Sequence, residues 1–165
     1  MEEKRGKRAT DGGTYMIVVD EKQDMKAVID YAKQRVIRNN AYFAFVYVID
    51  TEGYSTWEGV QDMMHKELRE KAEKLVWPLA KKVHEEEGMY SSIHIEEGSP
   101  SKIVSRIISE SENDVRELII GAEGSGAGSS SLISYFTTKG AADIHIPLVI
   151  VPIKQEAKQE KKEEE

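Results

Sequence analysis

The chain carries, at residues 117–124, the stretch Glu117-Leu118-Ile119-Ile120-Gly121-Ala122-Glu123-Gly124, in which a short apolar run leads into two glycines three residues apart. Such a run is typical of a buried strand. Gly121 and Gly124 accept φ above zero and, because they lack Cβ, let backbone N–H groups approach an anion. Residues 125–131 are rich in glycine and serine and can lead into a helix whose N-terminal amides favour negative charge. The stretch predicts a strand that ends at a phosphate-binding loop, although a ligand-free turn between strand and helix has the same pattern.

The composition favours one domain, because 165 residues can bury about two thirds of the surface that the unfolded chain exposes. The chain has no cysteine, which excludes a disulfide framework, a thiol nucleophile, a Cys-based zinc site and an iron–sulfur cluster. We therefore expect a cytoplasmic location. Residues 1–15 lack the apolar segment of a signal peptide, and no run approaches the roughly eighteen apolar residues that span a bilayer. These features predict a protein without membrane segments.

The charge distribution separates a central domain from two tails. The net charge of −7 argues against a nucleic-acid partner, which requires lysine and arginine to neutralise phosphates. Residues 154–165 hold four Lys and five Glu with alanine as the only apolar residue, so we expect a disordered tail. Residues 1–13 are similarly polar and end in Asp-Gly-Gly, which predicts a flexible lead-in. The folded domain should span residues 14–153.

Five short apolar segments alternate with longer segments of helical spacing, a pattern that builds a parallel sheet with helices on both faces. The third segment alternates apolar and polar residues, and the fifth is bracketed by prolines that cannot donate ladder hydrogen bonds. Both therefore suit the edges of a sheet. The predicted strands are Tyr15–Val19, Ala41–Ile49, Ser91–Glu96, Glu117–Ile120 and Pro147–Pro152.

Local signals predict how the helices begin and end. Asp20-x-x-Gln23 has the pattern of a capping box, and Ser99-Pro100 combines an N-cap serine with proline at the first helical position. Pro78 lies inside the longest helical stripe and predicts a kink or a break near Val76-Trp77. A short helix is expected at about residues 132–142.

The chain shows no catalytic constellation that spacing alone can identify. Neither a Walker A motif, nor Gly-x-Gly-x-x-Gly after the first strand, nor a Gly-x-Ser-x-Gly elbow is present. No two of the four histidines have the four-residue spacing of a helical metal site. We therefore predict no catalytic residues and no dedicated metal ligands.

The order of elements and the residues at their ends resemble the universal stress protein family over Tyr15–Pro152. The matches are Ile17-Val18-Val19-Asp20 closing the first strand, Val46-Tyr47-Val48-Ile49-Asp50 closing the second, Gly98-Ser99-Pro100 opening a helix, and Ile119-Ile120-Gly121-Ala122-Glu123-Gly124 leading on to the last strand. The resemblance implies an α/β fold with an open five-stranded parallel sheet, order 3-2-1-4-5, which is Rossmann-like and similar to the adenine nucleotide alpha hydrolases. It also implies a homodimer formed through the last strand.

The resemblance further implies a nucleotide site in which Asp20, Val48, Gly121 and Gly124 match the family's positions for binding ATP with Mg²⁺ or Mn²⁺. Asp20 can equally cap the following helix. Ser134-Tyr135 stands where ATP-binding members have glycine and a small hydroxyl residue, and the Tyr135 ring is large enough to occupy part of the phosphate site. Two hypotheses follow: a stress-response regulatory module that has lost nucleotide binding and acts through a protein partner, or an ATP-binding protein with weak ATPase activity at most.

Overall fold

The computed structural model describes residues 12–51, 58–123 and 130–154, and within these ranges it contains five strands, five α-helices and one 3₁₀ turn. The two predicted tails fall mainly outside these ranges and stay predictions. In chain order the elements are β1 Thr14–Val18, α2 Lys26–Asn39, β2 Tyr42–Asp50, α3 Glu58–Glu87, β3 Ser91–Gly98, α4 Pro100–Ser109, η1 Ser111–Asn113, β4 Val115–Glu123, α5 Ser130–Thr137, α6 Ala141–Ile144 and β5 Leu148–Ile153.

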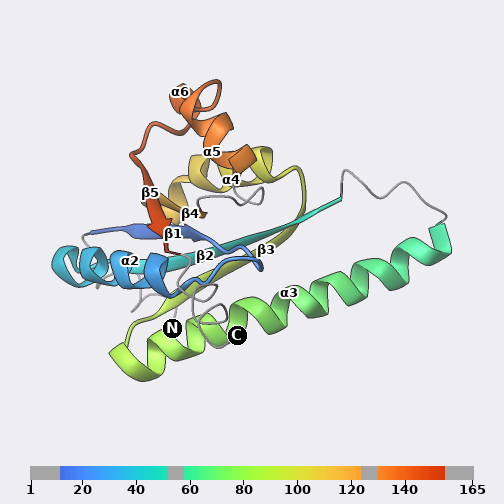
Figure 1. Cartoon of the computed structure of the whole chain (residues 1–165), viewed down its shortest axis with the longest axis horizontal. Coiled ribbons are helices and arrows are strands. Elements are labelled where there is room, and N and C mark those ends of the chain that lie inside the picture. The colour runs from blue at the N-terminus through green and yellow to red at the C-terminus, as the bar shows by residue number, and fades with distance from the viewer. Residues whose placement is uncertain (1–11, 52–57, 124–129, 155–165) are drawn as a thin grey trace, which may run out of the picture.

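All five strands pair in parallel in one sheet of order β3-β2-β1-β4-β5. This arrangement confirms the α/β class, the strand order and the two predicted edge strands, β3 and β5. The chain therefore leaves β1 toward one side of the sheet and returns through β4 on the other side (Figure 1).

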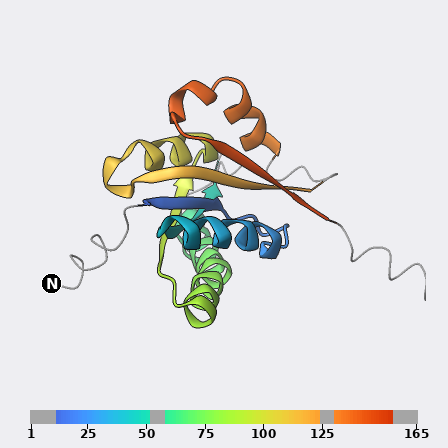
Figure 2. The same cartoon turned by 90° about the vertical axis from the view of Figure 1, so that its left-hand side faces the viewer.

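Helices cover both faces of the sheet, so the molecule has three layers (Figure 2). On one face α2 and α3 pack on an apolar cluster that includes Ile17, Phe43 and Ile119. On the other face α4, α5 and α6 pack on a second cluster that includes Leu118 and Phe136. Burial of the central strands on both faces explains why β1 and β4 read as continuous apolar runs in the sequence.

Helix α3 runs without a break through Pro78, so of the predicted kink or break the break is wrong, and the kink stays a prediction. Pro78 is exposed, and the carbonyl that loses its N–H partner can therefore bond to water. Val76 and Val83, on either side of the proline, are buried and hold the helix on the sheet. The N-terminal end of α3 projects beyond the sheet (Figure 1).

The segment predicted as one helix at residues 132–142 forms two helices, α5 and α6. The Thr137 and Thr138 hydroxyls donate to the carbonyls of Ile133 and Ser134, both at 2.7 Å, and Gly140 N donates to Tyr135 O at 2.8 Å. These bonds satisfy the last carbonyls of α5, as helix ends require. Within the described ranges, no helix combines the length and hydrophobicity needed to cross a membrane.

His94 on the edge strand β3 gives the fold a predicted pH dependence. It is half-buried on the α4 side, where burial, with a smaller contribution from Arg106, holds its pKa below the ordinary value despite the opposing effect of Glu110. A lowered folded pKa means that the unfolded chain binds the proton more tightly. The free energy of unfolding should therefore fall as the pH drops from about 6.5 toward the folded pKa.

Urea unfolding of the wild type and of His94→Gln at several pH values checks this expectation. The variant should lose part of the pH dependence in that window, because glutamine does not titrate. Parallel pH profiles for the two proteins would contradict it.

Candidate functional site at the carboxyl edge of the sheet

Three of the four predicted site residues lie at the same edge of the sheet, on neighbouring strands. Val18 of β1 pairs with Val46 of β2, and Val19 N donates to the carbonyl of Val46 at 2.8 Å, so Asp20 follows β1 at the edge where Val48 lies. Ile17 pairs with Ile119 of β4, which places Gly121 level with the residue before Asp20. Gly124 lies outside the described residues.

This edge contains the point at which the strand order reverses. β1 is flanked by β2, which follows it in the chain, and by β4, which comes from the other half of the fold. Open α/β sheets bind ligands outside the carboxyl ends of the strands at such a switch point. Asp20 follows β1, and Gly121 lies two residues before the end of β4, so both are placed on the two strands that border the switch point.

Asp20 shapes the turn after β1 rather than capping a helix. Its Oδ1 accepts a hydrogen bond from Lys22 N at 2.9 Å, and its carbonyl accepts one from Gln23 N at 3.2 Å. Helix α2 begins only at Lys26, with Met25 as an N-cap that forms no side-chain bond. The capping box predicted for Asp20 and Gln23 is therefore wrong, and the partly exposed Asp20 carboxylate lies before the helix.

Gln23 has a role that the sequence did not reveal, because it links the β1–α2 turn to β4. Its Nε2 donates to the carbonyl of Gly121 at 3.0 Å, across 98 positions of sequence. The capping-box pattern predicts only a local role for Gln23, and no local signal points to a contact at that separation.

The glycine at position 121 is required by close packing. Its φ is not positive, so the backbone conformation at this position suits any residue. A Cβ at this position would lie 2.6 Å from Gln23 Oε1, 2.8 Å from Ile153 Cδ1 and 2.9 Å from Val28 Cγ2. The glycine therefore lets α2, β5 and the β1–α2 turn close over β4, which differs from the conformational role predicted for it.

Val48 offers an apolar surface at the same edge. It is partly buried and packs against the cluster that lies under α4. Its main chain pairs with Glu96 of β3, so its position is set by the sheet and not by a loop. A flat apolar group bound at this edge would find a rigid contact there.

The Tyr135 ring lies at the end of α5 that leads to α6. The ring packs so closely on Gly140 that a Cβ there would clash with it, and it meets Phe136 edge to face with centroids 5.1 Å apart. Phosphate binding would use the opposite, N-terminal end of a helix. The ring thus packs on the connection between α5 and α6, and whether it also obstructs phosphate stays a prediction, since residues 124–129 lie outside the described ranges.

The carboxyl edge is acidic. Asp20, Asp50, Glu97 and Glu123 lie at or just after the ends of four strands. Glu97 Oε2 is 2.7 Å from His65 Nδ1 of α3, which holds this carboxylate at the β3 end of the edge. Bound phosphates would meet repulsion here unless a cation screened them.

No group of three or more metal-binding side chains is found in the part of the chain that the structure describes. A closed metal cage of side chains is thus not present among these residues. Mg²⁺ needs no such cage, because it is commonly held by one or two carboxylates together with phosphate oxygens and water. Asp20 suits that role.

Comparison with known proteins agrees with the fold described above. The model of the universal stress protein family matches residues 14–152. A search of curated proteins finds no match.

Among solved structures, the chain is similar to the universal stress protein UspA from Lactobacillus plantarum, with 15% identity, 85% of this chain and 97% of that chain covered, and a TM-score of 0.68. A universal stress protein family member from Arabidopsis thaliana with AMP bound shows 17% identity, coverage of 87% and 93%, and a TM-score of 0.58. The universal stress protein from Archaeoglobus fulgidus in complex with dAMP shows 14% identity, coverage of 84% and 97%, and a TM-score of 0.53.

At these identities the structural matches establish the fold. The family match begins at the first residue of β1 and ends one residue before the end of β5, so it spans all five strands of the sheet. The chain therefore belongs to the universal stress protein family.

Proposed function

We propose that this protein is a stress-response regulatory module that binds an adenine nucleotide at the carboxyl edge of its sheet and does not turn it over efficiently. The observation that carries the proposal is the convergence of Asp20, Val48 and Gly121 on three adjacent strand ends at the switch point. The AMP and dAMP in the Arabidopsis and Archaeoglobus structures support the choice of ligand class.

The residues suggest how the ligand would lie. The adenine would contact Val48, since this side chain is apolar and partly buried. Asp20 would bind a divalent ion on the phosphates. The phosphates would extend past Gly121 toward Gly124, which the family pattern also assigns to the site.

The acidic edge predicts which nucleotides bind without metal. No lysine or arginine occurs between Gly121 and Thr138, so the local sequence offers no side-chain cation for phosphate. ATP should therefore require Mg²⁺ or Mn²⁺, whereas AMP, with fewer charges, should depend on metal far less.

Isothermal titration calorimetry of the purified chain, with ATP and with AMP, each with and without Mg²⁺ or Mn²⁺, measures the affinities and tests the proposal. We expect micromolar binding of metal-bound ATP, weakened about tenfold by Asp20→Asn, while metal-free AMP binding is unchanged or improved. Gly124→Val should weaken both. Glu112→Gln is the matched control, because Glu112 is an exposed carboxylate that precedes β4, at the amino ends of the strands. Millimolar affinity for both nucleotides would refute the proposal.

A second candidate function is regulation through a protein partner without nucleotide. It is favoured by Ser134, an exposed residue of α5 at the position where nucleotide-binding members have glycine. Ser134→Gly separates the two functions: a gain of nucleotide affinity from an undetectable level would assign the lost site to this residue.

We also propose that β5 mediates a homodimer. β5 is an edge strand whose unpaired backbone groups can bond to another strand. Its Ile150 is an apolar side chain that is 42% exposed, and a second copy paired with β5 would cover it. A dimer that is disrupted by Ile150→Lys, measured by sedimentation velocity, would support this interface.

A further inference from the structure

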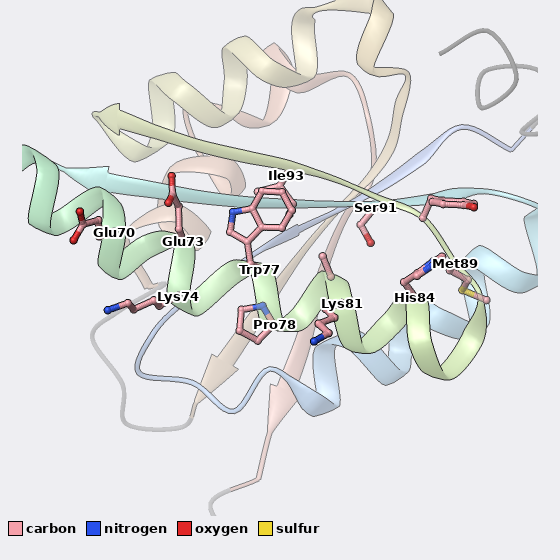
Figure 3. Close-up of a pocket in the computed structure, with 12 residues that line it drawn as sticks. Glu70, Glu73, Lys74, Trp77, Pro78, Lys81, His84, Met89, Ser91 and Ile93 are labelled. Carbon is pink, nitrogen blue, oxygen red and sulfur yellow. The ribbon is translucent and has the colours of Figure 1, made fainter. Parts of the chain in front are cut away.

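A groove with an apolar floor lies beside the edge strand β3, between β3 and α3 (Figure 3). Its volume is about 860 Å³. Trp77 of α3 is 58% exposed and Tyr90, just before β3, is 67% exposed. Figure 3 shows Trp77 directed toward β3, with Ile93 next to its indole. Large apolar side chains gathered in this way at an edge strand are typical of an interaction surface.

Five of the α3 residues that line the groove form a symmetric series around Trp77, and Lys74, Pro78 and Ala80 line it as well. We call Glu70, Glu73, Trp77, Lys81 and His84 the α3 stripe. Its members stand seven and four residues before Trp77, and four and seven residues after it. Side chains at these spacings share one side of a helix. Both carboxylates precede the tryptophan, and both basic side chains follow it.

We propose that the α3 stripe is the docking surface for a second copy of this chain, with the two α3 helices antiparallel and related by a two-fold axis at Trp77. In such a pair each position before Trp77 lies level with the same position after Trp77 on the other copy. Glu73 then faces Lys81 of the second copy, and Glu70 faces His84. The two-fold axis repeats each pair, so one surface complements itself in charge.

The apolar side chains complement one another in the same arrangement. Met63, which is 69% exposed, lies fourteen residues before Trp77, or about 21 Å along the helix. Met63 of the second copy therefore passes beyond the end of α3 at Glu87. Tyr90 packs on His84, with ring centroids 5.0 Å apart, so it lies near the level that Glu70 of the second copy reaches. Trp77 and Tyr90 are thereby covered together.

The contacts that the stripe makes within one copy leave it able to pair. Glu73 lies 3.5 Å from Arg69, and Lys81 lies 3.8 Å from Glu85, each one turn away on the same helix. Such exposed pairs are weak and exchange readily for contacts that exclude water. Lys74, three residues before Trp77, would lie level with the uncharged Ala80 of the second copy. The stripe and β5 lie at opposite edges of the sheet, so this contact does not compete with pairing through β5.

Charge reversal tests the proposal in the full chain. Glu73→Lys places a lysine at both positions of the contact between 73 and 81, and Lys81→Glu places a glutamate at both positions. Sedimentation velocity should show that each variant alone self-associates through this face about tenfold more weakly than the wild type. An equimolar mixture of the two variants should restore association, because every contact between positions 73 and 81 then joins opposite charges again. Unchanged association of the single variants, or no recovery in the mixture, would overturn the proposal.

The absence of cysteine from the chain allows a second, geometric test. A Glu73→Cys chain is mixed with a Lys81→Cys chain and treated with a short thiol-to-thiol crosslinker. We expect a covalent heterodimer that forms about tenfold faster than with Lys82→Cys, because the next residue points about 100° away around the helix. Lys82 is exposed and is therefore a matched control for reactivity. Equal rates, or no crosslinked product from either mixture, would exclude the two-fold arrangement.

Discussion

Replacement of Gly121 by valine should lower the free energy of unfolding by about 3 kcal/mol, because the new side chain enters space that is already filled. A Cβ alone would stand within 3.0 Å of Gln23, Ile153 and Val28. Gln23 ends in a flexible amide and can move, but its hydrogen bond to the Gly121 carbonyl would then be lost. Val28 is fully buried and Ile153 nearly so, and neither can retreat without disturbing α2 or β5.

Urea unfolding monitored by circular dichroism measures this change, and Gly88→Ala is an informative control. At Gly88 no atom lies within 4 Å of the Cβ position, but φ is +66°. That variant should cost only the left-handed backbone penalty of about 1 kcal/mol. If the Gly121 variant cost no more than the Gly88 variant, close packing would not be the reason for the glycine at position 121.

Replacement of Phe136 by alanine should destabilise the protein by about 4 kcal/mol. Phe136 is 2% exposed and is the largest buried side chain by which α5 packs on the sheet. Its loss leaves a cavity under α5 and removes the edge-to-face contact with Tyr135. The Tyr135 ring would then be free to leave Gly140, so the connection between α5 and α6 should loosen as well.

Thermal and urea unfolding, together with amide hydrogen exchange of α5, measure this effect. Ser134→Ala on the same helix is exposed and should change the free energy of unfolding by no more than about 0.5 kcal/mol. Faster exchange in α5 is expected for the Phe136 variant alone. Equal stability of the two variants would show that α5 does not depend on this anchor.

The predictions made from the sequence were most accurate for strands. The apolar runs that became β1, β2, β4 and β5 were located to within a few residues, and the alternation in β3 correctly predicted an edge. Strand β4 extends further in both directions than the four residues predicted, because Gly121 and its neighbours still pair with β5. Sheet pairing, and not the local turn signal, decides where that strand ends.

The candidate site could be predicted only in part. The ends of the strands revealed Asp20, Val48 and Gly121, since residues that follow parallel strands share one edge of the sheet. The contact of Gln23 with Gly121, and the packing of Tyr135 on Gly140, were not visible. Both depend on where a side chain finds space after the layers close, and residue spacing carries no information about that space.

The sequence by itself determined the class of fold, the strand segments, the two edge strands and the family pattern at the strand ends, because propensity and periodicity act over a few residues. The tertiary structure alone decided that α3 passes unbroken through Pro78, that Gly121 serves packing, and that Tyr135 packs on Gly140. These outcomes arise from contacts between layers, where burial on the sheet outweighs the local preference of a single residue.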